Sequence, residues 1–377
     1  MIEPPGEPQR ALAVVDLGAV ERNCGRLASE LSAGVELCAV VKADGYGHGA
    51  IECARAALAG GATRLAVATG SEAAELHAGL PDVPILAMGA LAPSELELAL
   101  RSGSEVAVWD RRFADAIADH GDALGIRPRV HVKYDSGMGR LGELDPDAAL
   151  ALASQVAGDP RLELAGCWTH FATADDPASP FFDTQLERFS AFAGRVRERH
   201  PDVLLHAANS AATLRDAASH FDMVRCGVAI YGLDPFQQDP LGRQLEPALE
   251  LRSYVAAVKR FRAGQSAGYG RCWQASSETY VGVLPIGYGD GVRRGLSNNG
   301  EVLVDGARRA LVGTVSMDNI TVDLGPGTSI EPGEHAVVIG AQRDERILAE
   351  ELASRLETIN YEITCGIAPR VPRTYRR

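Results

Sequence analysis

Eight short apolar segments, each followed by a longer amphipathic stretch, occupy most of the chain between residues 36 and 230. Strand and helix repeated eight times over about 200 residues are typical of a (β/α)8 barrel. We therefore predict an α/β fold that begins with a TIM barrel. The eight predicted strands are Glu36–Val41, Arg64–Thr69, Pro84–Met88, Glu105–Trp109, Arg129–Lys133, Leu162–Trp168, Val203–Ala207 and Asp222–Arg225.

The stretches between these segments have helical spacing and helix-start signals. Ser71-Glu72 and Pro93 each open a predicted helix, and the segment 181–200 repeats apolar residues at helical intervals. Asp16 is predicted to cap a leading helix that reaches Leu31.

Beyond residue 244 the pattern changes to alternating strands and tight turns. Asp305-Gly306 is a hairpin signal, and a late helix is predicted over 347–356. The predicted strands are 280–285, 301–304, 310–315 and 335–339. We expect a barrel domain over 11–244, followed by a mostly β C-terminal domain over 245–377 that also takes in the first ten or so residues.

Composition excludes several classes of function. The chain of 377 residues has 50 acidic and 37 basic residues, a net charge of -13, which argues against a nucleic-acid partner. Its seven cysteines are spaced unlike a zinc site or a disulfide framework. The N-terminus lacks the pattern of a signal peptide, and no segment has the length and apolarity of a membrane span. We expect a cytoplasmic protein with neither a metal nor a membrane contact.

Chemically distinctive residues fall at the ends of the predicted strands. Because an ammonium group is costly to bury, Lys42, which ends the first strand with Tyr46 four residues on, indicates a Schiff-base lysine rather than a snorkelling one. A barrel enzyme builds its active site at the carboxyl ends of its strands. Lys133 ends the fifth strand, His170 follows the sixth, Asn209-Ser210 follow the seventh, and Arg225 and Gly227 end or follow the eighth.

Small residues after the seventh and eighth strands indicate a phosphate site. In 208–212 and 225–229 the backbone N–H groups can approach an anion closely, and this is the recurrent phosphate position of the fold. A lysine across the barrel mouth from a phosphate favours pyridoxal 5′-phosphate (PLP) as the cofactor.

These motifs carry a resemblance to a known family. The segment 40–49, Val-Val-Lys-Ala-Asp-Gly-Tyr-Gly-His-Gly, resembles the PLP-lysine signature of the alanine racemases. Further blocks resemble the family in the same order along nearly the whole chain, at 132–142, 169–175, 209–212, 224–228, 268–270, 285–291, 316–318 and 360–362.

The resemblance implies a homodimer with shared active sites and two acid/base residues. Lys42 holds PLP and is one of them, and Tyr269, donated by the partner subunit, is the other. By the family's pattern, Lys42 serves the D-enantiomer face and Tyr269 the L. Inversion through a planar intermediate needs a proton donor on each face, so two such groups are required.

The resemblance also implies binding roles. Arg225 donates to the pyridine nitrogen and His170 supports it, while Arg140 contacts the cofactor's phenolic oxygen and the substrate carboxylate. The Met317 amide binds that carboxylate from the other chain. The phosphate site comprises Tyr46, Asn209, Ser210, the amides of Gly227 and Val228, and Tyr361.

Several positions have a second interpretation besides the role that the resemblance implies. Lys133 matches a lysine that is carbamylated in many members, or it forms a simple salt bridge with Asp135 or Glu143. Two departures from the family's pattern, Thr314 and Ser316, bear on the polarity of the access channel rather than on the chemistry. Asp175, Tyr288 and Arg294 line the substrate's access path by resemblance, or make ordinary surface contacts.

The implied function is racemisation of alanine, supplying D-alanine for bacterial peptidoglycan. One alternative is a PLP-dependent decarboxylase of the same architecture, in which a carboxylate faces the pyridine nitrogen where this chain has Arg225. A second is a non-catalytic PLP carrier, which leaves Tyr269 without a role. A small substrate is expected if Tyr269, Tyr361 and Met317 crowd the site.

Overall fold

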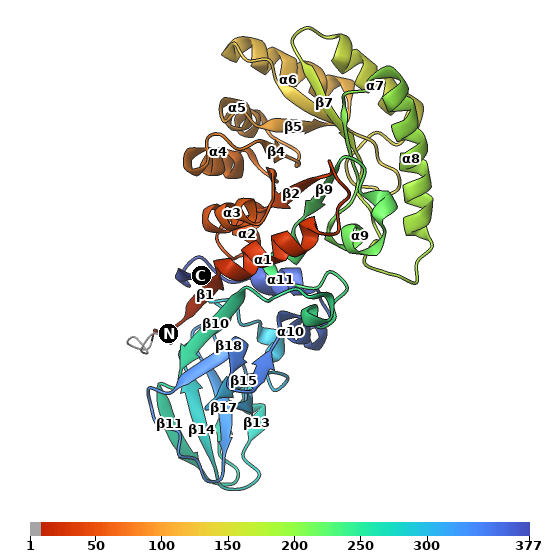
Figure 1. Cartoon of the computed structure of the whole chain (residues 1–377). Coiled ribbons are helices and arrows are strands. Elements are labelled where there is room, and N and C mark those ends of the chain that lie inside the picture. The colour runs from red at the N-terminus through yellow and green to blue at the C-terminus, as the bar shows by residue number, and fades with distance from the viewer. Residues whose placement is uncertain (1–8) are drawn as a thin grey trace. The chain divides into compact units, whose positions relative to one another are not determined.

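The computed structural model describes residues 9–377. The chain separates into two compact units, one spanning Val20–Ile230 and the other joining the segment up to Ala19 to Tyr231–Arg377 (Figure 1). The sequence predicted barrel limits of 11 and 244, and the first eight residues of its predicted N-terminal addition to the β domain lie outside the described residues. Within residues 9–377, no helix combines the length and apolarity needed to cross a membrane.

The first unit is the predicted barrel. Its eight parallel strands close into a ring, with Glu36–Val40 pairing in parallel to Met223–Cys226 where first and last strands meet. Each predicted strand is present, with ends that differ by at most two residues. The strands are β2 (Glu36–Val40), β3 (Arg64–Val67), β4 (Ile85–Ala87), β5 (Glu105–Val108), β6 (Arg129–Lys133), β7 (Glu163–Trp168), β8 (Leu204–His206) and β9 (Met223–Cys226).

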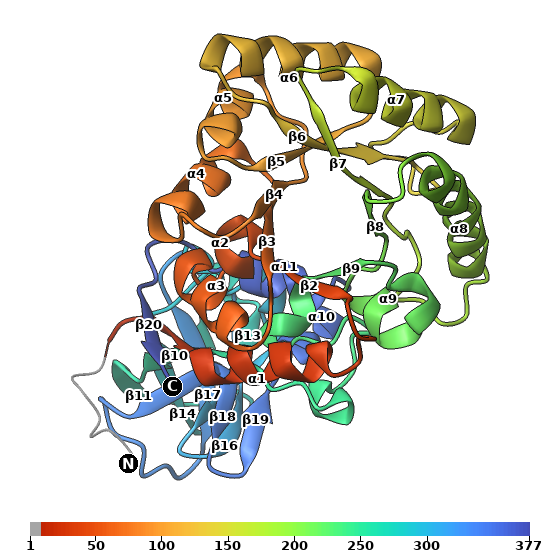
Figure 2. The same cartoon turned by 45° about the horizontal axis from the view of Figure 1, so that its top comes forward.

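Helices α4 to α9 lie outside the ring of strands (Figure 2). Local capping explains where several begin: Thr69 and Glu72 form a capping box before α4, and Asp16 accepts from the Ala19 amide at 2.8 Å in the leading helix. The helices are α1 (Leu17–Ala28), α2 (Lys42–Tyr46), α3 (Ala50–Ala59), α4 (Gly70–Gly79), α5 (Pro93–Arg101), α6 (Arg111–Leu124), α7 (Pro146–Gly158), α8 (Phe181–Arg199) and α9 (Ser210–Arg215).

The second unit is mostly β, as predicted. Its largest sheet has the strand order β16-β15-β18-β10-β1-β20, with β19 paired to β18. The unit also contains a three-stranded sheet, β11-β14-β17, and a two-stranded sheet, β12-β13. The elements are β1 (Leu12–Asp16), β10 (Leu249–Tyr254), β11 (Ala257–Phe261), β12 (Ser266–Ala267), β13 (Trp273–Gln274), β14 (Thr279–Leu284), β15 (Glu301–Val304), β16 (Ala307–Ala310), β17 (Ile320–Gly325), β18 (His335–Gln342), β19 (Glu345–Ile347), β20 (Arg373–Arg376), α10 (Ala349–Arg355) and α11 (Asn360–Cys365).

The predicted strand over 310–315 is wrong. The two-residue turn at Asp305-Gly306 pairs Val304 directly with Ala307, so the returning strand β16 starts at once and ends at Ala310. Gly313, with φ 83°, then takes the chain out of extended geometry. The segment 311–315 instead forms a loop, in which Leu311 makes an isolated bridge to Val322 and the Val312 amide donates to the Thr321 carbonyl oxygen at 2.9 Å.

A buried carboxylate organises the loop between β14 and β15. Asp290 is fully buried and accepts from Arg10, from Arg370 Nε at 2.8 Å and from the Gly287 amide at 2.9 Å. Arg370 also donates to the Met317 carbonyl oxygen at 3.3 Å, so the carboxylate joins the loop 287–291 to the loop that carries Met317. Burial opposes ionisation of Asp290, but the two arginine hydrogen bonds hold its pKa below the usual value.

We expect Asp290→Asn to lower the free energy of unfolding by about 1–3 kcal/mol, because two guanidinium groups lose a charged acceptor. The carboxylate's contribution is present above the unfolded-state pKa and is lost as pH falls through the depressed folded-state pKa, so the two proteins converge in acid. Urea unfolding at neutral and acidic pH measures both effects. Asp318→Asn, which removes the more exposed partner of Arg370, is the control, and equal losses in both variants would contradict the assignment.

Candidate active site

Lys42 follows the end of β2 and starts a left-handed turn. Ala43 and Asp44 have φ values of 52° and 53°, and Gly45 and Tyr46 follow with 61° and 53°. A non-glycine residue in this region costs about 1–2 kcal/mol, so three of these positions are strained. The turn brings the Tyr46 ring to 6.0 Å from Lys42 Nζ, which places the phenol beside the ammonium group.

Hydrogen bonds to residues outside the turn hold it in place. Glu72 accepts from the Ala43 amide at 2.6 Å, and Asp44 accepts from the Ala50 amide at 2.9 Å. His48 is fully buried, and its Nδ1 lies 3.0 Å from the carbonyl oxygens of Gly45 and Tyr46. Only a protonated Nδ1 can donate to these oxygens, so His48 acts as a cap for the turn.

Three segments converge on the predicted phosphate position. Ser210 Oγ, at the start of α9, accepts from the Gly227 amide at 3.0 Å and lies 3.4 Å from the Ala229 amide. A Cβ on Gly227 would lie 2.4 Å from the Tyr46 hydroxyl, so only glycine lets this hydroxyl reach the backbone. Asn209 caps α9 by accepting from the Ala212 amide at 2.9 Å, which fixes the orientation of the segment.

Arg225 is 3% exposed on β9. Its Nη2 donates to the carbonyl oxygens of Thr169 and Ala207, each at 2.9 Å, and its Nη1 donates to His206 Nδ1 at 2.7 Å. His170 Nδ1 lies 3.4 Å from Nη2, as the predicted supporting contact requires. Among the described residues, Nε of Arg225 has no hydrogen-bond partner, so its N–H group remains available to a ligand.

Lys133 is buried without an ion pair. It is 1% exposed, and no carboxylate of residues 9–377 lies within 4.0 Å of its Nζ, so the salt bridge with Asp135 or Glu143 does not form in this structure. Its Nζ lies 4.4 Å from the Trp168 ring. Burial, followed by the charges of Arg140 and Arg225, lowers the pKa of Lys133 to about 8. The same causes, burial first and then Arg225, place the pKa of His170 well below its usual value.

Asp135 holds the loop that carries Arg140. Its Oδ1 accepts from the amides of Gly137 and Met138, at 2.9 and 2.6 Å, and its Oδ2 accepts from those of Gly139 and Arg140, at 2.8 and 3.1 Å. Four consecutive N–H groups thus converge on one carboxylate. The Arg140 side chain remains exposed, with its backbone fixed.

The other predicted residues belong to the second unit, apart from Asp175, which is exposed on the barrel unit, and Val228, which is buried there just after β9. Tyr269 is 73% exposed and Met317 52% exposed. Thr314 donates to the Tyr269 carbonyl oxygen at 2.8 Å, so this departure from the family's pattern helps to fix the Tyr269 loop. Ser316 donates to the Asn319 carbonyl oxygen at 2.7 Å. Tyr288 and Arg294 are exposed and Tyr361 lies in the first turn of α11, half-buried.

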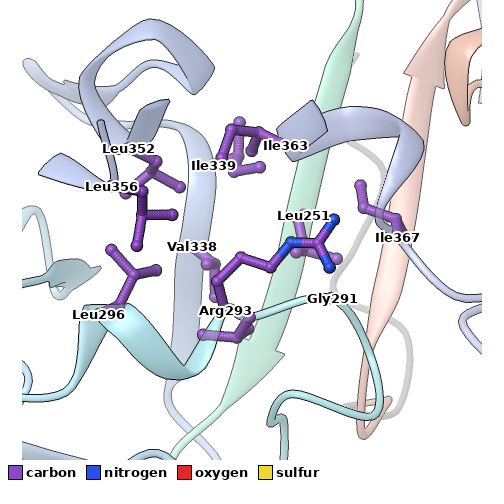
Figure 3. Close-up of a pocket in the computed structure, with 11 residues that line it drawn as sticks. Leu251, Gly291, Arg293, Leu296, Val338, Ile339, Leu352, Leu356, Ile363 and Ile367 are labelled. Carbon is purple, nitrogen blue, oxygen red and sulfur yellow. The ribbon is translucent and has the colours of Figure 1, made fainter. Parts of the chain in front are cut away.

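A separate hollow in the second unit lacks the groups of a reaction centre. It is lined largely by aliphatic side chains from β10, β18, α10 and α11, and Arg293 extends among them toward Leu251 and Ile367 (Figure 3). Arg293 Nη2 donates to the Glu362 carbonyl oxygen at 3.0 Å. We therefore interpret this hollow as a packing defect around the Arg293 side chain and not as an active site.

The barrel residues fit PLP. Ser210, Gly227 and Tyr46 form a small cradle suited to a phosphate, Lys42 supplies an amine, and the unpartnered Nε–H of Arg225 suits an aromatic ring nitrogen. Two residues of this region were missed from the sequence. Trp168 contacts both Lys133 and Arg225, and Asp135 was considered only as a salt-bridge partner. The sequence did contain a signal for Trp168, because it is the last residue of a predicted barrel strand and such strand ends form the active site of a barrel enzyme.

Two family models together match nearly the whole chain. The model "Alanine racemase, N-terminal domain" matches residues 15–235, and "Alanine racemase, C-terminal domain" matches 248–375. Alanine racemase from Symbiobacterium thermophilum is 41% identical over 96% of each chain, and that from Mycobacterium avium is 40% identical over 97% of this chain and 95% of its own.

Solved structures agree with this likeness. Alanine racemase from D-cycloserine-producing Streptomyces lavendulae has a TM-score of 0.92 at 36% identity, covering 100% of this chain and 98% of its own. Alanine racemase from Bacillus anthracis, solved with bound L-Ala-P, has a TM-score of 0.91 at 36% identity, covering 99% and 96%.

We expect Asp135→Asn to loosen the Arg140 loop. An amide offers one acceptor oxygen and turns an NH2 group toward other N–H donors, so the loop loses about 1–3 kcal/mol of local stability. Hydrogen exchange of the amides of residues 137–140 measures this change. Asp145→Asn, at the cap of α7, is the control, and unchanged protection of 137–140 in Asp135→Asn would count against the assigned role.

Proposed function

The chain belongs to the alanine racemase family and is an amino-acid racemase, and we propose that it interconverts L-alanine and D-alanine with PLP held on Lys42. The observation that carries this proposal is the meeting of three features at one barrel edge. These are the amine of Lys42, the cradle of Tyr46, Ser210 and Gly227, and the buried Arg225.

When bound, the cofactor supplies an electron-withdrawing ring that stabilises the carbanion left by removal of the α-proton. The chain's own residues position it. Tyr46, Ser210 and the amides of Gly227 and Val228 hold the phosphate, with Asn209 ordering the segment between them. Tyr361 is proposed as a further phosphate ligand, on the resemblance of the block 360–362.

Arg225 controls the charge of the ring. A guanidinium remains protonated at neutral pH even where burial lowers the pKa of Arg225 to about 10. It can only donate, so it keeps the ring nitrogen that faces it unprotonated. An unprotonated ring is the weaker electron sink, which favours return of the proton to the α-carbon over decarboxylation or transamination.

Two groups move the α-proton. Lys42 Nζ holds a proton on one face of the substrate, and the Tyr269 hydroxyl holds one on the other. Tyr269 and Met317 are both well exposed in the single chain, which supports a homodimer in which each is donated to the partner's site. Arg140 and the Met317 amide bind the substrate carboxylate, and Asp175, Tyr288 and Arg294 line the access path.

Lys133 is proposed to be carbamylated. Its pKa of about 8 leaves a substantial neutral fraction near physiological pH, and a neutral amine is the form that adds to carbon dioxide. The resulting anion would pair with Arg140, whose charge now disfavours the ammonium form. We further propose that the enzyme acts in the cytoplasm and supplies D-alanine for peptidoglycan.

The two-base assignment predicts an asymmetric defect in Tyr269→Phe. We expect racemisation to fall about 10²–10⁴-fold, because one face loses its proton carrier, while exchange of the D-alanine α-proton through Lys42 continues with retained configuration. Incubation of each enantiomer in heavy water with added PLP, followed by mass and chiral analysis, separates exchange from inversion. Tyr375→Phe, at a 40% exposed tyrosine of β20, is the control. Undiminished racemisation by Tyr269→Phe would refute the assignment, and carbon dioxide release from L-alanine would favour a decarboxylase.

If Lys133 is carbamylated, labelled carbon dioxide should give a carbamate signal from this residue. We expect ¹³C NMR of protein under ¹³C-labelled carbon dioxide at fixed pressure to show a carbamate that increases as pH rises through about 8, since the neutral amine fraction increases there. The chain has three lysines, Lys42, Lys133 and Lys259, so few competing signals exist. Lys133→Arg should abolish the signal and Lys259→Arg should retain it. A signal that survives in Lys133→Arg would show that the carbamate lies elsewhere.

A further inference from the structure

A continuous row of four polar side chains crosses the interior of the barrel. Glu105 Oε2 lies 2.8 Å from His131 Nε2, His131 Nδ1 lies 2.9 Å from His206 Nε2, and His206 Nδ1 lies 2.7 Å from Arg225 Nη1. All four are buried, with exposed fractions of 4%, 0%, 0% and 3%. Barrel interiors are ordinarily filled by apolar branched residues, so this row requires a reason.

The direction of every hydrogen bond in the row follows from Arg225. A guanidinium has donors and no acceptor, so His206 Nδ1 must accept and carry no proton. His206 is therefore neutral with its proton on Nε2, which donates to His131 Nδ1. His131 in turn carries its proton on Nε2, which donates to Glu105 Oε2. Burial, and then the charge of Arg225, place the pKa of His206 well below its usual value, in agreement with this pattern.

The far end of the row is fixed as an anion. Arg64 Nη1 donates to both oxygens of Glu105, at 3.1 and 3.0 Å, and Arg129 Nε donates to Oε1 at 2.9 Å. Burial alone would raise the pKa of Glu105, but the hydrogen bond from His131 and the charges of the two arginines hold it well below the usual range. An ionised carboxylate can only accept, so both ends impose the same direction.

Packing keeps the two imidazoles in place. The Trp168 ring stacks on His206 with an interplanar angle of 7°, and Arg225 Cζ lies 4.8 Å from the same ring. A Cβ on Gly166 would lie 2.2 Å from His131 Nδ1, so β7 has a glycine where the imidazole needs the room. Neither ring can turn over without displacing these neighbours.

We propose that Glu105, His131 and His206 are positioning residues that orient Arg225 toward the cofactor's ring nitrogen and thereby suppress transamination. The proposal rests on the function proposed above. If His206 carried its proton on Nδ1 instead, that N–H group would face Arg225 Nη1 and displace the guanidinium. A proton on His131 Nδ1 would have the same effect, because it would force His206 to change its tautomer. The ring nitrogen would then be free to take a proton, and the stronger electron sink would favour the side reaction.

Glu105→Gln tests the direction of the row. With Arg64 and Arg129 holding the amide oxygen in the place of Oε1, the NH2 group faces His131 Nε2, which must then accept. The imidazole becomes the Nδ1–H form, and the conflict passes through His206 to Arg225. Glu163→Gln is the matched control, because Glu163 also pairs with Arg129 but is 41% exposed on its side chain and touches neither histidine.

The first readout is independent of turnover. Long-range ¹H–¹⁵N correlation spectra of ¹⁵N-histidine-labelled protein without cofactor report the tautomer of each imidazole. We expect His131 and His206 to be neutral Nε2–H forms in the wild type and in Glu163→Gln, and His131 to switch to Nδ1–H in Glu105→Gln. An Nδ1–H or doubly protonated His206 in the wild type overturns the proposal, and this outcome does not depend on whether the variant folds.

The second readout is the ratio of pyruvate to inverted alanine in the PLP-loaded enzyme. In the side reaction the amino group of alanine passes to the cofactor's aldehyde carbon, and water supplies the oxygen of the released pyruvate. We expect this ratio to rise about tenfold or more in Glu105→Gln, the usual scale for losing a partner of a ligand-binding group, and to stay within about twofold in Glu163→Gln. Equal ratios in the two variants overturn the proposal, whereas a wild type that inverts no alanine overturns the proposed function instead.

Discussion

The guanidinium of Arg225 is a full positive charge buried inside a parallel barrel, and the rest of the site is arranged around it. The desolvation of such a charge costs roughly several kcal/mol unless it is hydrogen-bonded. The carbonyl oxygens of Thr169 and Ala207 meet this need because they lie just beyond β7 and β8, where no further ladder bond uses them. A parallel barrel thus provides at its carboxyl edge the acceptors that a buried cation requires.

The same edge explains what the sequence could predict. Strand-helix alternation locates all eight strands, and parallel strands bring their carboxyl ends together, so Lys42, Lys133 and Arg225 could be placed at one edge before any geometry was known. Local signals also located α4, α5 and α8, where caps or apolar spacing decide the boundaries. These predictions succeeded because each depends on a short-range pattern or on the topology alone.

The parts that could not be predicted depend on partners distant in sequence. Glu72 holds the left-handed turn after Lys42 by accepting a hydrogen bond from the amide of Ala43, which lies 29 residues away in sequence. Without this distant partner, the local backbone preferences of the turn's non-glycine residues would disfavour it. His131 was treated as part of an apolar strand, although period-two alternation places it on the same face as Lys133. The loop at 311–315 was taken as a strand because its apolar residues suggested one, whereas hairpin register had already ended the pairing at Ala310.

Lysine usage gives a further reason to assign chemistry to this edge. The chain has 37 basic residues but only three lysines, and two of these, Lys42 and Lys133, lie in the barrel site. Arginine serves wherever a permanent charge or a forked donor is sufficient, as in the pairs around Glu105 and Asp290. It cannot give up its proton to become a nucleophile. In the function proposed above, the two lysines kept inside the barrel are those whose amine must become neutral, Lys42 to bind an aldehyde and exchange the α-proton, and Lys133 to bind carbon dioxide.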